Sequence, residues 1–209
     1  MGRRVDDATP FLPERRTLGA LREAAAGCRG CHLWRPATQT VFGEGLKRAR
    51  VMFVGEQPGD KEDLAGRPFV GPAGKELDKG LEAAGIARDE AYVTNVVKHF
   101  KFEERGRRRI HQTPKRFEID ACKPWLAEEL HVVGPEALVL LGATAAKALM
   151  GSAFRLTRHR GELLDCELAP IVTATIHPSA ILRQRGDPAR AAEREAFADD
   201  LRVVAQALG

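Results

Sequence analysis

The 209-residue sequence lacks any apolar run long enough to cross a membrane, since a transmembrane helix needs about 20 consecutive apolar residues. Its amino end also lacks the apolar core of a secretory signal peptide. Internal repeats and low-complexity tracts are absent as well, which argues against a repeat architecture. We therefore expect a cytoplasmic protein that makes no contact with a membrane.

Cysteine is scarce, with four residues in the chain. In a cytoplasmic protein a few cysteines are more often metal ligands or free thiols than a disulfide framework. The length suits one α/β domain with a sizeable core, whereas two full domains would be cramped. Residues 1–16 mix charges and prolines without periodicity, so we predict a flexible lead-in there and a single domain over 17–209.

Positive charge is only slightly in excess, with 33 Lys and Arg against 29 Asp and Glu. The distribution is more informative than the sum, because six basic residues fall within one twelve-residue segment: Lys98, Lys101, Arg105, Arg107, Arg108 and Arg109. Such a segment would contact phosphates if it lies beside the functional site. Otherwise it is a solvated surface loop.

Four short apolar runs, at residues 51–54, 92–97, 137–141 and 171–175, are typical of fully buried strands. Helical patterns separate or flank them at 18–26, 75–84, 113–130, 143–150 and 189–208, and Thr113 is the expected N-cap of the third helix. Residues 161–168 are a possible extra edge strand. Buried strands alternating with helices predict a three-layer α/β/α fold around a central, mainly parallel four-stranded sheet.

Unusual polar residues and turns follow the end of each expected strand. Glu56 and Asp60 follow the first, Asn95 and His99 lie at or beyond the end of the second, Gly142 follows the third, and His177 follows the fourth. Ligands of open α/β sheets bind at the carboxyl ends of the strands. These residues therefore all fall on one edge of the expected sheet, which predicts a functional site at that edge. Scattered surface residues would not be expected to line up in this way.

Two consecutive segments, GEQPGD at 55–60 and GRPFVGPAG at 66–74, resemble the first motif region of the uracil-DNA glycosylase superfamily, especially its iron-sulfur members grouped as family 4. The segment IHPSAIL at 176–182 resembles the second signature of these enzymes. The resemblance implies cleavage of the bond between uracil and deoxyribose, with uracil-containing DNA as partner and free uracil as product.

The same resemblance assigns roles to residues of the two motifs. His177 would donate to uracil O2 and stabilise the departing anion, with Pro178 and Ser179 against phosphate. Asn95 has an amide that matches the N3–H and O4 of uracil and not cytosine. Phe69 would stack on the flipped base and Gly55 would lie against it, while Gln57 would hydrogen-bond the uracil or its backbone neighbours.

Metal ligands are expected among the cysteines. Cys28 and Cys31 form a Cys-x-x-Cys pair, which on its own could be a redox pair or half a metal site. Family 4 members hold a four-iron cluster with two such cysteines, one after the second strand and one in the next helix. Here Cys122 fills the last position, and His99 stands where the family has cysteine. We favour Cys28, Cys31, His99 and Cys122 as ligands of a 4Fe-4S cluster, with Cys166 or His32 as the alternative fourth ligand and structural zinc as the alternative metal.

An insertion at residues 100–111 separates these ligands and ends in Arg-Arg-Ile-His. It resembles the distinguishing loop of the UdgX members of the superfamily, which bind uracil-DNA irreversibly through a histidine. The resemblance implies that His111 attacks the sugar at C1′, with Arg109 anchoring the loop through Glu56 or Asp60. Lys98, Arg107 and Arg108 would then contact DNA.

Three functions remain open from the sequence. The first is a single-turnover glycosylase that stays covalently attached to DNA, and the second is a hydrolytic iron-sulfur glycosylase in which a carboxylate near Glu56 directs water. The third, a non-enzymatic iron-sulfur DNA-binding or redox-sensing protein, fits poorly with the acids of GEQPGD and with His177. For the first two we expect a monomer, associated with the nucleoid when bound to DNA, that accepts single-stranded DNA.

Overall fold

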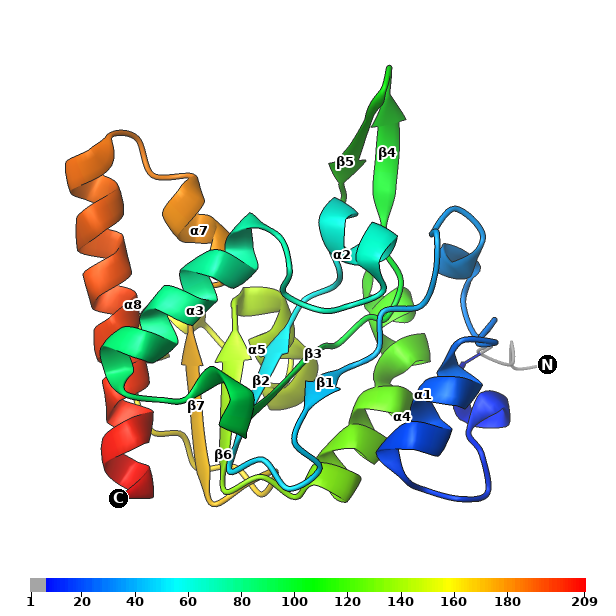
Figure 1. The fold of residues 1–209 in the computed structure, drawn as a ribbon, viewed down its shortest axis with the longest axis horizontal. Coiled ribbons are helices and arrows are strands. Elements are labelled where there is room, and N and C mark those ends of the chain that lie inside the picture. Colours follow the sequence, from blue (N-terminus) through cyan, green and yellow to red (C-terminus); the bar gives the residue numbers. More distant parts are fainter. Residues whose placement is uncertain (1–6) are drawn as a thin grey trace.

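A five-stranded sheet forms the centre of the protein, in a computed structural model that describes residues 7–209 (Figure 1). The strand order is β1 (Glu44–Gly45), β3 (Ala91–Asn95), β2 (Val51–Gly55), β6 (Ala137–Leu141) and β7 (Ile171–Thr175). All neighbours are parallel except the two-residue β1, which pairs antiparallel with β3. The four expected strands are confirmed, and β1 is an additional edge strand.

Helices cover both faces of this sheet, which confirms the three-layer arrangement. One face carries α1 (Leu18–Ala25), α4 (Arg116–Val133) and α5 (Ala143–Met150), and the other carries α3 (Pro72–Ala84) and α8 (Asp187–Leu208). Shorter elements connect them: η1 (Thr9–Phe11), η2 (His32–Trp34), α2 (Asp60–Ala65), η3 (Arg88–Glu90), α6 (Leu156–His159) and α7 (Ser179–Leu182). In the part of the chain that the structure describes, no helix is both long and apolar enough to span a bilayer.

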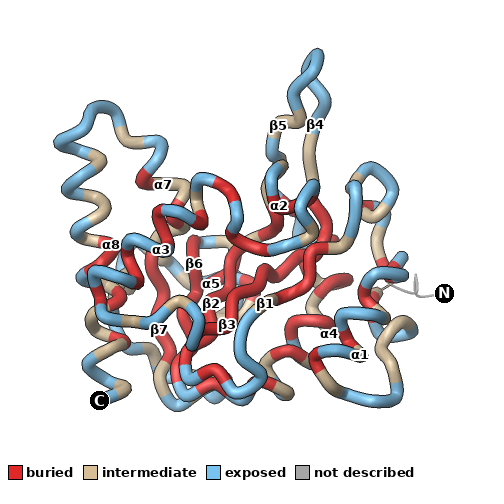
Figure 2. The backbone as a smooth tube through the Cα atoms, viewed as in Figure 1, coloured by how far each residue is buried: buried red, intermediate tan, exposed pale blue. Residues whose placement is uncertain are grey.

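The continuous apolar runs of the strands are explained by burial on both faces. Side chains alternate along a strand, so Met52 and Val54 pack with α1, α4 and α5, whereas Val51 and Phe53 pack with α3 and α8. All five residues of β2, β3 and β6 are buried, and Figure 2 shows this buried sheet between exposed outer helices.

Several expected boundaries are wrong. The second strand ends at Asn95, and helix α4 begins at Arg116 with Lys115 as N-cap, so Thr113 does not cap it. Residues 161–168 contribute only an isolated bridge between Leu163 and Thr173. Within the expected lead-in, residues 1–6 lie outside the described residues, but Ala8 is fully buried and its N–H donates to Ala121 O over 2.8 Å. This part of the segment is packed on the domain.

The arginine-rich insertion forms a β-hairpin and not an irregular loop. Strands β4 (Phe102–Arg105) and β5 (Arg108–His111) pair antiparallel around Gly106, whose φ of 60° a glycine adopts without strain. The hairpin projects beyond the carboxyl ends of the central strands, beside α2 (Figure 1). Its register places His111 opposite Phe102 at the base and Arg107 and Arg108 at the tip.

Candidate active site

A cavity of about 850 Å³ opens at the carboxyl ends of the central strands. It brings together eight of the residues that the sequence predicts for the site: Glu56, Gln57, Asp60, Phe69, Asn95, His111, His177 and Ser179. Arg107, Arg108 and Pro178 do not line it. The volume exceeds what a single base needs and lies in the range typical of pockets for small ligands.

Gly55 lies where three of these side chains converge. A Cβ at this position would lie 2.4 Å from Asn95 Oδ1, 2.8 Å from Phe69 Cζ and 3.5 Å from His177 Nε2. Because real Cβ atoms do not approach other atoms so closely, only glycine fits. Asn95 is 3% exposed, and its Oδ1 has no hydrogen-bond partner in the described structure. A buried amide oxygen without a partner is costly, so this one is available to a ligand that donates a hydrogen bond.

His177 is held as a neutral donor. The backbone N–H of Ser179 can only donate, and it lies 3.2 Å from His177 Nδ1, so Nδ1 accepts and the ring proton is on Nε2. The pKa of His177 is lowered to about 4, chiefly by burial and also by the nearby His111 and Arg183. Phe69 stacks against the ring at a centroid distance of 6.1 Å. The Nε2–H group of His177 therefore lies with Asn95 Oδ1 around Gly55.

His111 stands at the mouth of the cavity, at the end of β5. Its Nε2 lies 3.3 Å from Glu56 Oε1, and its side chain is 49% exposed against 18% for Glu56. Burial lowers the pKa of His111, Glu56 opposes this shift, and Arg183 adds to it. The imidazole is accordingly neutral near pH 7, with a lone pair for a reacting group.

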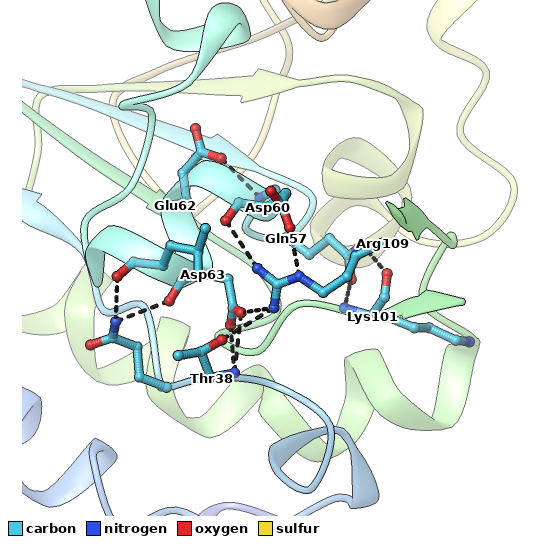
Figure 3. Close-up of polar contacts among 10 residues, drawn as sticks. Thr38, Gln57, Asp60, Glu62, Asp63, Lys101 and Arg109 are labelled. Carbon is cyan, nitrogen blue, oxygen red and sulfur yellow. Dashed lines mark hydrogen bonds and ion pairs between the residues drawn. The ribbon is translucent and has the colours of Figure 1, made fainter. Parts of the chain in front are cut away.

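Arg109 ties the hairpin to α2, as Figure 3 shows. Its Nε donates to Asp60 Oδ1 and its Nη1 to Asp63 Oδ2, each over 2.6 Å, and Nη1 also reaches Thr38 Oγ1 at 3.1 Å. Asp63 is fully buried. The structure thus places Asp60 as a partner of Arg109, and the expected anchoring role of Arg109 agrees with these contacts.

Gln57 also anchors the hairpin, since its side chain bonds to backbone groups and not toward the base. Its Nε2 donates to Lys101 O over 3.2 Å and to Gln112 O over 3.1 Å, and its Oε1 accepts from Lys101 N over 3.0 Å (Figure 3). Both amide protons are used by the backbone at the base of the hairpin. The side chain is therefore a brace for β4 and β5 and has no free donor for a base.

A family model described as "Uracil DNA glycosylase superfamily" matches residues 42–202. The chain belongs to this superfamily. It is 38% identical over 174 residues to a "Type-4 uracil-DNA glycosylase" of Sulfurisphaera tokodaii, covering 79% of this chain and 76% of that protein. A Thermotoga maritima protein with the same description is 38% identical over 169 residues, covering 80% and 84%. A "DNA polymerase" of Bacillus phage SP01 is 30% identical over 79% of this chain, which corresponds to 16% of the polymerase.

Lys98 is the clearest error among the DNA contacts expected for this superfamily member. Its side chain is fully buried, where Nζ pairs with Glu129 and donates to Asn95 O over 2.7 Å and Thr94 Oγ1 over 2.6 Å. Glu129 in turn accepts from Tyr92 Oη over 2.9 Å and from Gly43 N over 3.1 Å. A buried ammonium with three partners cannot reach a phosphate. The burial of Lys98 could not be predicted from the distribution of charge along the sequence, because that distribution does not indicate which lysines face inward.

Three cysteines lie near one another on the α1 and α4 side of the sheet. The pKa of Cys122 is raised to about 12, chiefly by burial; Lys98 opposes this shift, and the nearby thiols of Cys31 and Cys28 contribute to it. Cys122 Sγ accepts from Lys98 N over 3.3 Å, and Cys28 Sγ accepts from the Trp125 indole over 3.2 Å. Donors of this kind stabilise thiolates. Cys166 has no contact of this sort with the three in the structure as described, although it packs against the same core.

His99 offers a free ring nitrogen beside these thiols. It shares a cavity of about 170 Å³ with Cys28. Thr40 Oγ1 donates to Ala25 O over 2.9 Å, so it accepts from His99 Nε2 at 2.9 Å, and His99 Nδ1 keeps its lone pair. Burial lowers the pKa of His99 to about 4, which keeps the ring neutral. A neutral imidazole with an unused nitrogen is what a metal ligand requires.

Cys28, Cys31, Cys122 and His99 offer three thiols and one imidazole as donors. Among residues 7–209 no group of three or more His, Cys, Asp or Glu side chains is arranged to hold one metal ion, and zinc would require four ligands at about 2.0 to 2.3 Å. A four-iron core is larger and takes ligands that lie further apart. Cysteine thiolates are the usual ligands of such a core, and histidine replaces cysteine in some iron-sulfur centres.

Several residues of the site were missed from the sequence. Asp63 and Thr38 hold Arg109, and Arg183 lines the cavity and donates to Ser179 Oγ over 3.1 Å. Asp63 follows three residues after Asp60, a spacing that places both on one helix face. This spacing could have identified it. No sequence pattern indicates Thr38, which lies in an irregular segment far along the chain from Arg109.

Proposed function

We propose that the protein excises uracil from DNA and then remains covalently attached to the resulting sugar through His111. The observation that carries this proposal is the position of the neutral His111 imidazole, 3.3 Å from Glu56 at the mouth of a cavity that ends at Asn95 and His177. The superfamily membership and the similarity to proteins described as type-4 uracil-DNA glycosylases support the excision step.

The base would be recognised around Gly55. The unpartnered Asn95 Oδ1 would accept from uracil N3–H, while the amide NH₂ would donate to O4. His177 Nε2–H would donate to uracil O2, where negative charge develops as the glycosidic bond breaks. Because His177 is neutral, it donates without transferring a full proton. Phe69 would supply the apolar wall against which the flipped base stacks.

The bond between C1′ and uracil N1 breaks, and its electron pair leaves with uracil as an anion that later takes a proton from solvent. A ring nitrogen of His111 then donates its lone pair to C1′ of the oxocarbenium-like sugar, forming an alkylated imidazolium that loses its remaining ring proton to solvent. Glu56 stabilises the positive charge on the sugar and on the ring. Holding the ring at this position is worth an effective molarity on the order of 10⁵ M or more, so it outcompetes water.

The cluster proposed for this protein has a structural role. Cys28, Cys31, His99 and Cys122 would hold a 4Fe-4S cluster, which would cross-link the amino-terminal segment to the start of the hairpin and to α4. None of the bond changes above passes through it.

The alternative function is a hydrolytic uracil-DNA glycosylase with turnover. Glu56 favours it, because this carboxylate lies in the cavity, where it could direct a water molecule to C1′. His111 would then be a phosphate-contacting residue of the hairpin. In either function, we propose that the protein acts as a cytoplasmic monomer and that single-stranded DNA is accepted.

A denaturing gel distinguishes the two functions. Protein mixed with uracil-containing single-stranded DNA should give a band of the combined mass that survives denaturation. The control is the same DNA with thymine in place of uracil, which should give no such band. His111→Ser should lose this band and still release uracil, leaving an abasic site. A parent chain that turns over many equivalents of DNA without a retained band would support the hydrolytic alternative, and an adduct formed by His111→Ser would contradict the role of His111.

A further inference from the structure

One buried carboxylate caps two consecutive helices beside the cavity. Glu62, 8% exposed, accepts from Gly59 N through Oε2 over 3.1 Å and from Gly71 N through Oε1 over 2.7 Å. Gly59 is the N-cap of α2 and Gly71 the N-cap of α3, and as glycines neither has a side chain to cap its own helix. Both oxygens of Glu62 are therefore used to join the two helix starts, and Figure 3 shows Glu62 on α2 beside Asp60 and Asp63.

The segment between these two caps carries Phe69. In residues 7–209, Phe69 is the one non-glycine residue with a positive φ, 55°, a conformation that the surrounding structure must impose. At the other end of the turn, a Cβ on Gly74 would lie 1.7 Å from Phe69 O, so the first turn of α3 packs directly on the Phe69 backbone. Displacing the start of α3 would therefore displace Phe69.

Phe69 forms one wall of the space around Gly55, where its Cζ would lie 2.8 Å from a Cβ at that position. The opposing group, Asn95, belongs to the sheet and does not move with α3. The width of the space between Phe69 and Asn95 thus depends on where α3 begins relative to α2. Glu62 is the side chain that joins the two.

We propose that Glu62 is a positioning residue that sets the width of the base pocket by fixing Phe69 through the two N-cap amides. This inference rests on the proposed excision of uracil. Glutamine at position 62 has only one oxygen, so its NH₂ group would face one of the two amide donors, and that bond would be replaced by a repulsion. Phe69 would then be free to move away from the base.

The test compares Glu62→Gln with Glu76→Gln. Glu76 is a matched control because it is also buried, 5% exposed, and lies on α3, but it pairs with Arg194 and Lys79 and does not line the cavity. The single-turnover rate of uracil release is measured against DNA concentration, together with Tm. We expect Glu62→Gln to lower the maximal rate by at least about tenfold, since small misplacements in an active site have effects of this size or larger. Glu76→Gln should lower Tm and leave the maximal rate within about twofold of the parent chain.

A double-mutant cycle tests whether Glu62 acts through Phe69. In a Phe69→Ala background, Glu62→Gln should lower the rate by less than about twofold further, because coupled residues are non-additive. Glu62→Asp, which keeps the charge but is too short to reach both amides, is measured in parallel. The proposal is overturned if folded Glu62→Gln or folded Glu62→Asp releases uracil at a rate within about twofold of the parent chain. It is also overturned if the rate effects of Glu62→Gln and Phe69→Ala multiply fully in the double variant. An inactive parent chain would instead contradict the proposed function itself.

Discussion

The identity of residue 55 determines whether the cavity can accept a base at all. Gly55→Ala would place a methyl group 2.4 Å from Asn95 Oδ1 and 2.8 Å from Phe69 Cζ. We expect it to abolish uracil release, because the methyl group occupies the point where the recognition groups converge. The measurement is the single-turnover rate of uracil release from single-stranded DNA.

Gly19→Ala is a suitable control for this change, since a Cβ at Gly19 has no atom within 4 Å and lies in α1. It should keep the parental rate and raise stability slightly, because alanine is the better helix former by about 1 kcal/mol. Wild-type activity in Gly55→Ala would place the base elsewhere.

Protonation of His111 should control the pH dependence of adduct formation. Its pKa is lowered by burial, so the nucleophilic neutral form predominates at neutral pH and is lost as the pH falls through that lowered pKa. We expect the midpoint of the decline in the rate of adduct formation to lie below about pH 6.5, the ordinary histidine pKa. An NMR titration of the His111 ring in the free protein gives the pKa directly. A midpoint above that of an exposed histidine would contradict the assignment.

At the scale of secondary-structure elements, the hairpin is a precisely held part of the site and not a loose basic loop. Two acids of α2 hold Arg109, and Gln57 holds the backbone at the hairpin base. The guanidinium of Arg109 presents its donors in a fixed plane, so binding one carboxylate through Nε and another through Nη1 fixes its orientation. These contacts orient β5, and His111 is the last residue of β5.

Removal of the clamp should affect attachment more than excision. Arg109→Gln would leave the buried Asp63 without its cation and free the end of β5, whereas the groups around Gly55 would stay in place. We expect adduct formation to slow by about 100-fold, the effect of a displacement near 1 Å, and uracil release to change much less. Both rates are read from one time course by denaturing gel and by uracil quantification.

Arg108→Gln provides the comparison for Arg109→Gln. Arg108 lies at the exposed tip of the hairpin, with no partner on α2. The Arg108→Gln substitution should leave the rates of adduct formation and uracil release nearly unchanged at high DNA concentration, and it should weaken DNA binding in a salt-dependent way. Equal loss of adduct formation in the two variants would mean that charge, and not the clamp, is responsible.

At the scale of the whole molecule, a buried ion pair joins the sheet to α4 beneath the site. Lys98→Met would leave Glu129 uncompensated in the core, which typically costs about 3 to 5 kcal/mol. We expect a large fall in the free energy of unfolding measured by urea denaturation. Because Lys98 Nζ also holds Asn95 O, uracil release should slow as well.

The double variant Lys98→Met with Glu129→Gln should recover part of this stability, because no buried charge remains without a partner. Equal stability in the single and double variants would show that lost packing, and not the unpaired carboxylate, causes the change.

On the side of the sheet that α1 and α4 cover, the proposed cluster should join the amino-terminal segment to α4. Loss of any ligand is expected to remove the visible absorbance and lower Tm, because binding free energy of a cluster contributes to folding. His99→Ala should bleach the purified protein, whereas Cys166→Ser should retain its colour. The opposite pattern of absorbance would exchange the two residues in the ligand set.

Much of the architecture follows from local sequence. The apolar runs that became β2, β3, β6 and β7 are buried on both faces, and a strand of this kind can lie only inside a covered parallel sheet. The carboxyl ends of such strands meet at one edge. For this reason Asn95, Glu56 and His177 could be placed together before any contact was known.

Tertiary structure alone decided which polar side chains face the cavity. Lys98 and Arg107 look alike in a basic segment, yet one is fully buried against Glu129 and the other lies at the exposed turn of the hairpin. Gln57 lies in the expected turn but bonds to a backbone 44 residues away. Such outcomes depend on pairing between distant segments, and no local periodicity encodes them.

The sequence by itself therefore determined the layers, the edge that carries the site and the chemical types gathered there, because burial and strand direction are properties of short segments. Only the folded chain decided the hairpin, the clamp on Arg109 and the use of Glu62 to join two helix starts. The clamp on Arg109 requires groups 46 to 71 residues apart to meet. The hairpin and Glu62 use partners within ten residues, and the packing of the whole domain fixes where those partners lie.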